Sequence, residues 1–131
     1  MHDTDAFARM PALDSHAAQP PAELVQRFET QCEVLFKGEL YLVRDNGAVL
    51  RRARPQGRYR KLDECWSFGA LNKSAGYLEI AGQRVHRIVA TAFHGPAPSA
   101  EHVVDHIDTN RLNNRPDNLR WVTRLDNILL N

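Results

Sequence analysis

The spacing of hydrophobic and polar residues predicts a regular order of elements in the C-terminal part of the chain. Residues 84–94 place apolar side chains at helical spacing, and Gly95-Pro96 follows as a stop signal, so we expect a helix there. Residues 102–106 and 119–122 have the composition of short strands. The segment 107–118 between them is a polar loop rich in asparagine and aspartate.

A last helix is predicted to start at Thr123. Asp126 follows three residues later, which is the spacing of a capping box. An apolar stripe runs along this helix, and Asn127 lies off the stripe. The stripe is expected to face the core, so the side chain of Asn127 is free to face a cleft. The stripe consists of Leu125, Ile128 and Leu129.

The N-terminal half has shorter and more interrupted patterns. Residues 22–31 could form a short helix, and residues 33–52 are typical of a hairpin with a turn at Asn46-Gly47. Pro55 and Gly57 interrupt any regular element over 53–61, so we expect a loop there. Residues 76–80 have the composition of another strand.

These elements predict an α+β fold, in which a small strand-rich N-terminal half precedes a helix and a C-terminal strand–strand–helix unit. Residues 1–21 have no apolar periodicity and are expected to be a flexible tail. We expect a short helix and a strand-rich module over 22–82, and a second unit over 83–131.

Positive charge is concentrated in one stretch of the chain. The net charge is only +1, but residues 44–61 contain seven basic residues against Asp45 as the one acidic residue. Such a block can neutralise phosphate groups, and the alternative interpretation is a solvated basic loop. The candidate DNA contacts are therefore Arg44, Arg51, Arg52, Arg54, Arg58, Arg60 and Lys61.

Composition disfavours a membrane protein and a zinc-stabilised fold. No apolar run approaches the roughly 18 residues of a membrane span, and the N-terminus lacks a signal-peptide pattern. We therefore expect a cytoplasmic protein without a membrane partner. Cys32 and Cys65 match no zinc spacing, so no structural zinc is expected. A disulfide between them stays an alternative to two reduced thiols.

The C-terminal segment combines groups that suit phosphodiester hydrolysis. Asp105 and His106 are adjacent, Asn118 lies 12 residues after His106, and Asn127 lies 21 residues after it. Hydrolysis needs a base that titrates near neutral pH and positive charge near the phosphate, which favours histidine and a divalent ion. Asp105 and Asn127 offer hard oxygen donors. The alternatives are a structural histidine, turn-forming Asp105 and Asn118, and a surface Asn127.

The segment VVDHIDTNRLNNRPDNLRWVTRLDN, residues 103–127, resembles the ββα-metal (His-Me finger) core of HNH endonucleases, especially the branch found in phage homing endonucleases. VHRIVATAF, residues 85–93, resembles the helix that commonly precedes this core. The region 33–82 is more loosely similar to the strand-rich module that often comes before it.

The resemblance implies a role for each motif residue. Asp105 matches the first metal ligand, and Asn127 matches the second, where many relatives have histidine. His106 matches the general base. Asn118 matches the residue that orients the base and braces the loop. The implied cofactor is one Mg²⁺ or Mn²⁺ ion per site.

The implied function is metal-dependent hydrolysis of DNA by an HNH endonuclease in a bacterial or phage-infected cell. The alternative is a nucleic-acid-binding module that keeps the HNH fold without cutting. Competent residues at all four motif positions favour the enzyme. DNA is the implied partner, and a homodimer stays an open alternative.

Overall fold

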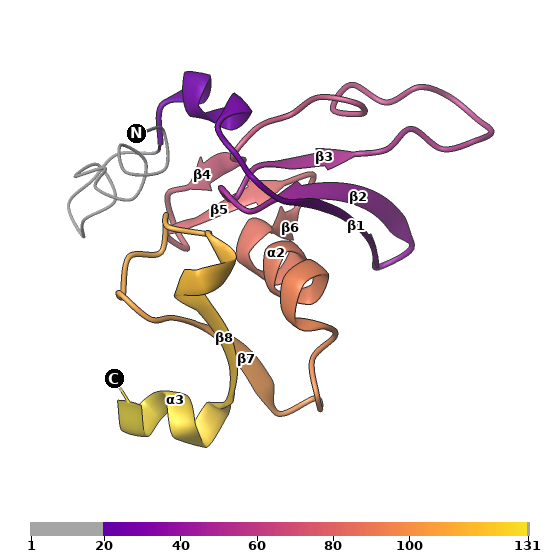
Figure 1. The fold of residues 1–131 in the computed structure, drawn as a ribbon. Coiled ribbons are helices and arrows are strands. Elements are labelled where there is room, and N and C mark those ends of the chain that lie inside the picture. The colour runs from indigo at the N-terminus through magenta and orange to yellow at the C-terminus, as the bar shows by residue number, and fades with distance from the viewer. Residues whose placement is uncertain (1–19, 131) are drawn as a thin grey trace.

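The computed structural model describes residues 20–130 and shows the predicted α+β architecture (Figure 1). Strands form two three-stranded antiparallel sheets, β1-β2-β3 and β4-β5-β6, and one two-stranded hairpin, β7-β8. The order is η2 (Ala22–Gln26), β1 (Gln31–Phe36), β2 (Glu39–Arg44), β3 (Val49–Arg51), β4 (Ala70–Asn72), β5 (Tyr77–Ile80), β6 (Gln83–Arg84), α2 (Val85–His94), β7 (His102–His106), η3 (Pro116–Asn118), β8 (Leu119–Thr123) and α3 (Arg124–Leu130).

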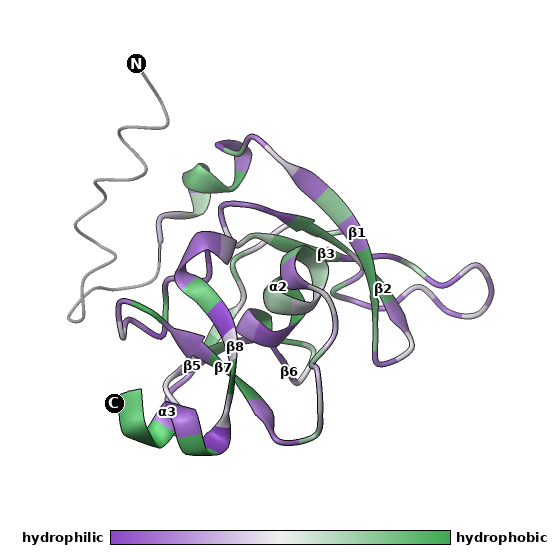
Figure 2. Ribbon diagram, turned by 60° about the horizontal axis from the view of Figure 1, so that its bottom comes forward, coloured by the Kyte–Doolittle hydropathy of each residue, from purple (hydrophilic) through white to green (hydrophobic). Residues whose placement is uncertain are grey.

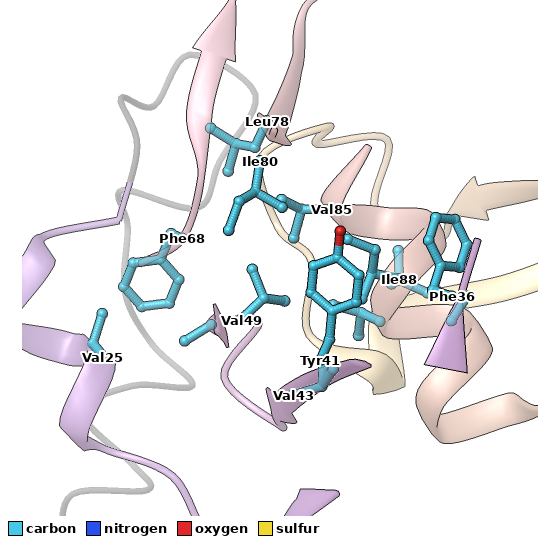
Figure 3. Close-up of a cluster of buried hydrophobic side chains, with 14 of the residues drawn as sticks. Val25, Phe36, Tyr41, Val43, Val49, Phe68, Leu78, Ile80, Val85 and Ile88 are labelled. Atoms are coloured by element: carbon cyan, nitrogen blue, oxygen red, sulfur yellow. The ribbon is translucent and has the colours of Figure 1, made fainter. Parts of the chain in front are cut away.

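The helix α2 is the centre of the core. Val85, Ile88 and Val89 are fully buried at helical spacing, as the sequence pattern predicted. They pack in one cluster with Tyr41 from β2 and Leu78 from β5 (Figure 3). Burial of each such side chain contributes about 1.5–3 kcal/mol. The predicted boundary between residues 82 and 83 falls between β5 and β6, so both parts of the chain share this core.

The predicted helix over 22–31 is wrong in length. A 3-10 helix covers only Ala22–Gln26, and β1 already begins at Gln31. The reason is the Asn46 side chain in the β2–β3 turn, whose amide donates hydrogen bonds to three carbonyl oxygens of this segment. These contacts, to Leu24, Val25 and Arg27, occupy oxygens that a longer α-helix would use within itself.

The elements of the C-terminal part match the sequence pattern closely. Strand β7 covers the expected residues, and Gly95 ends α2 at a positive φ of 83°. The backbone nitrogen of Asp126 donates to the hydroxyl of Thr123 at 3.0 Å, as a helix cap requires. The sequence pattern missed two short strands, β4 and β6.

The expected orientation of α3 is wrong. Its apolar stripe faces outward, with Leu125, Ile128 and Leu129 between 66% and 75% exposed, whereas Asn127 is half-buried. Figure 2 shows α3 at the edge of the molecule, with hydrophobic positions in green alternating with hydrophilic ones in purple. An amphipathic stripe indicates which residues share a face, but it does not identify the surface that the face contacts.

Among residues 20–130, no helix has the length and apolar character that crossing a bilayer requires. Cys32 and Cys65 are both free thiols.

Candidate active site

The β7–β8 hairpin places the predicted pair Asp105 and His106 at its inner end. Asp105 is paired in register with Arg120, and His106 with Leu119. Adjacent strand residues point to opposite faces, so the two side chains diverge. The Asp105 carboxylate is buried and accepts a hydrogen bond from Arg120 Nε at 2.9 Å. Arg120 therefore compensates the charge of a carboxylate that burial would otherwise destabilise.

The loop after His106 is held together by a hydrogen-bond network around Asp108. The Asp108 carboxylate accepts hydrogen bonds from the side chains of Asn113 and Asn118. The Asn118 amide oxygen accepts in return from the backbone nitrogen of Asp108 at 2.9 Å. These contacts place Asn118 where it braces the loop. Asn118 is not the hydrogen-bond partner of the His106 ring, which bonds to Asn114 instead.

Asn114 is the partner of the His106 ring, and sequence reasoning missed it. The Asn114 Oδ1 atom lies 2.7 Å from His106 Nε2, in a buried contact. An amide oxygen only accepts hydrogen bonds, so Nε2 carries the hydrogen and the lone pair of the neutral ring lies on Nδ1. Asn114 is one of several asparagines in the polar loop 107–118, and nothing in the local pattern separates it from the others.

The N-terminal half supports Asn114 through Gly47. A β-carbon at Gly47 would lie 3.2 Å from the backbone carbonyl of Asn114, which is closer than ordinary contacts. Gly47 also has a φ of +91°, which side-chain-bearing residues rarely adopt. The turn between β2 and β3 is therefore packed directly against the loop that fixes the histidine.

Two aromatic rings enclose His106. Tyr77, at the start of β5, stacks on it with ring centroids 6.1 Å apart, and His86 of α2 meets it edge-on at 5.1 Å. His86 is buried, and its Nδ1 atom has no hydrogen-bond partner among the described residues. Its position beside His106 follows from the packing of α2.

Burial keeps both imidazoles neutral. Burial lowers the pKa of His86 to about 3, and the charge that His106 would carry when protonated and the charges of Arg84, Arg87 and Arg111 act in the same direction. Burial also lowers the pKa of His106, although the hydrogen bond to Asn114 and the charges of Asp108 and Asp105 oppose this. His106 is therefore in its unprotonated form at neutral pH, as a general base requires.

The predicted metal ligands come from elements in contact. α3, which carries Asn127, packs against β7, which carries Asp105. Residues 20–130 contain no cluster of three or more histidine, cysteine, aspartate or glutamate side chains that could hold a metal. A carboxylate and an amide oxygen fit Mg²⁺ or Mn²⁺, because such ions keep several waters and need few protein ligands. One Asp105 oxygen accepts a hydrogen bond from Arg120 Nε, which fixes the orientation of the carboxylate.

The basic block predicted to bind DNA is largely paired inside the protein. Arg51 and Arg60 contact the buried Asp63 carboxylate at 2.9 and 3.1 Å. Arg54 and Arg60 contact Glu39 at 2.8 and 2.7 Å. Arg52 pairs with Glu64 at 3.1 Å. In the described part of the chain only Arg58 and Lys61 of the block are exposed without an ion pair.

Arg44 is buried between aromatic rings and hydrogen-bonded within the protein. It is 8% exposed, and its guanidinium lies 4.0 Å from the Phe28 ring centroid and 3.6 Å from that of Trp66. It donates hydrogen bonds to Gln31 and to the Val25 carbonyl. With both faces of the guanidinium covered, this arrangement disfavours contact between Arg44 and a phosphate.

Comparison with known proteins connects this site to a family. Residues 83–129 match the family model described as HNH endonuclease. An uncharacterized HNH endonuclease of Acanthamoeba polyphaga mimivirus is 40% identical over 52 residues, which are 39% of this chain and 13% of that protein. A solved structure titled "DNA binding and cleavage by the HNH homing endonuclease I-HmuI" is 31% identical, with a TM-score of 0.46, over 69% of this chain and 50% of that chain.

The chain thus spans only part of the length of each relative. The family match begins at β6 and ends within α3, so it includes α2, the β7–β8 hairpin and all four motif residues. The family resemblance inferred from the motif is confirmed. Residues 83–129 are similar to the HNH endonuclease family.

Proposed function

We propose that this chain is a metal-dependent endonuclease that hydrolyses DNA phosphodiester bonds, with His106 as the general base. The observation that carries the proposal is the environment of His106. Its Nε2–H is held by Asn114, its ring is fixed by Tyr77 and His86, and burial keeps it neutral. These contacts leave the Nδ1 lone pair as the proton acceptor.

The chemistry assigned to His106 is removal of a proton from the attacking water. The imidazolium formed at Nδ1 is stabilised because the Nε2–H bond to Asn114 strengthens when the ring is charged. The charges of Asp105 and Asp108 also favour the protonated ring after the transfer. His106 can therefore accept a proton transiently while resting in the neutral form.

Asp105 and Asn127 would hold the divalent ion. When bound, such an ion stabilises the negative charge that develops on the phosphate during hydrolysis. Arg120 holds one oxygen of the Asp105 carboxylate and so fixes its orientation. Asn118 fixes the backbone of the loop that follows His106. The donor chemistry favours Mg²⁺ or Mn²⁺ over zinc, which prefers nitrogen and sulfur ligands.

The test is single-turnover cleavage of plasmid DNA by wild type and His106→Ala at saturating protein, with Mg²⁺ and with EDTA. We expect Mg²⁺-dependent nicking or cutting by wild type. Loss of a general base should slow it by about 10²–10⁴-fold. DNA affinity and the far-UV circular dichroism spectrum should stay close to those of wild type.

Two outcomes would contradict the proposal. A His106→Ala rate within a factor of about three of wild type would remove the base assignment, since the expected loss is at least about 10²-fold. DNA binding without cleavage under any divalent ion would instead support the non-cleaving binding module. Lys37→Gln, in the β1–β2 turn, serves as a control for mutagenesis and purification.

A further inference from the structure

We propose that Arg84 and Arg111, stacked on Tyr77 beside His106, each bind a backbone phosphate of the nucleic acid. This inference rests on the proposed function and adds to it the residues that hold the substrate next to the base. We name this group, Tyr77 with Arg84 and Arg111, the tyrosine platform.

The platform is defined by ring contacts. The guanidinium of Arg84 lies 4.5 Å from the Tyr77 ring centroid, and that of Arg111 lies 4.8 Å from it. The same Tyr77 ring stacks on His106. The two cations and the candidate base therefore share one aromatic neighbour. Stacking restricts each guanidinium before a ligand arrives, which lowers the entropy lost on binding.

The backbone around the platform brings distant segments together. Arg111 belongs to the loop after β7, and its Nη1 donates to the carbonyl of Ala75 just before β5 at 3.0 Å. A β-carbon at Gly76 would come within 3.1 Å of that Nη1, so the small residue permits the close approach. Arg84 comes from β6, which pairs with β5 (Figure 1).

The charge of the platform is less compensated than that of the basic block. Within residues 20–130 Arg111 forms no ion pair, and Arg84 has only a 3.6 Å contact with Glu79 while its side chain is 41% exposed. A guanidinium stacked on a ring keeps N–H groups at its edge, and these groups can form two parallel bonds to a phosphate. The platform thus offers exposed donors where the block offers mostly neutralised ones.

The positive charges of the platform also reach His86, the buried neighbour of His106. Its protonation is disfavoured first by burial and then by the charges of His106, Arg84, Arg87 and Arg111. Three cationic side chains, Arg84, Arg87 and Arg111, therefore act on the same buried point beside the candidate base. An anionic phosphate is the ligand that such a field would attract.

The experiment measures binding of a fluorescein-labelled DNA duplex by anisotropy at several salt concentrations, in EDTA so that no cleavage occurs. We compare wild type with R84Q/R111Q and with R27Q/K37Q, which removes the same charge from exposed positions near β1. Loss of two phosphate contacts should lower the slope of log K against log salt by about 2. It should weaken binding at least tenfold, whereas R27Q/K37Q should leave the slope near that of wild type.

The outcomes separate this inference from the proposed function. If wild type binds no duplex, the proposed function fails. If wild type binds and R84Q/R111Q keeps its affinity and slope, the platform is overturned, and an equal loss in R27Q/K37Q would overturn it too. Should R84Q/R111Q lose its fold by circular dichroism, the exposed single variant R111Q decides, with an expected slope change of about 1.

Discussion

The two arginine-rich regions of this protein differ in how much of their positive charge is neutralised by contacts within the same chain. The block from Arg44 to Lys61 has the highest density of basic residues in the sequence, yet most of its guanidiniums contact carboxylates or aromatic rings of the same chain. The arginines around the β7–β8 hairpin are more scattered in sequence. Two of them nevertheless meet on Tyr77 next to His106.

The difference shows why a charge count over a sequence window misleads. The carboxylates that neutralise the block, Glu39, Asp63 and Glu64, lie just outside the window of residues 44–61. The fold places these carboxylates next to the arginines of β3 and of the loop after it, where they form ion pairs. Figure 1 shows this loop, between β3 and β4, reaching away from the body of the molecule. Its exposed end, with Arg58 and Lys61, is the part of the block that can still meet a phosphate.

The largest expected effect comes from Asp63→Ala. Asp63 is fully buried and contacts Arg51 and Arg60, so its removal leaves Arg51 as a buried charge without its partner. We expect the melting temperature to fall by about 12 °C or more. Calorimetry gives the change, with Asp117→Ala, an exposed aspartate, as the control. A fall of only a few degrees would show that these arginines are not needed for the fold.

The sequence predicted the elements around the candidate site better than the surroundings of the basic block, because local patterns determine more of their secondary structure. The period of α2, the strand composition of β7 and the Thr123 cap are properties of neighbouring residues. Strands β4 and β6 are three and two residues long, too short for a period to be visible. The motif spacing predicted Asp105 and His106 as site residues, but only the fold brings Tyr77 to His106.

The contacts that tune His106 depend on tertiary packing. Asn114 reaches the ring because its loop rests on the Gly47 turn, and His86 reaches it because α2 crosses the β7–β8 hairpin. No periodic pattern in the sequence predicts either contact. The stripe of α3 shows the opposite: its helical pattern is clear in the sequence, but the side chains expected to be buried are exposed.

A smaller effect concerns the stability of the block in acid. Hydrogen bonds from Arg60 and Arg54 lower the pKa of Glu39 from 4.5 to about 2. Because the pKa is lower in the folded state, this carboxylate stabilises the fold above pH 4.5, and the contribution is lost as pH falls toward 2. The melting temperature of Glu39→Gln should therefore depend less on pH over this window than that of wild type.

The measurement is a set of thermal melts between pH 2 and pH 7. Other carboxylates also titrate there, so the relevant quantity is the difference between wild type and Glu39→Gln at each pH. That difference should be largest above pH 4.5 and shrink toward pH 2. A constant difference would mean that Glu39 does not hold the arginines through its charge.

The smallest expected effect is on DNA affinity when the exposed end of the block is neutralised. Arg58 and Lys61 have no ion pair in the described part of the chain and no aromatic ring under them. They must therefore be ordered by the DNA itself, which offsets much of the charge attraction. R58Q/K61Q should weaken duplex binding by about fivefold at most, alike on unrelated sequences. Its loss should be smaller than that of R84Q/R111Q in the same anisotropy titrations, because the two side chains on Tyr77 are already held in place. If R58Q/K61Q loses more affinity than R84Q/R111Q, the exposed loop is the main electrostatic contact, and the contrast between the two regions is reversed.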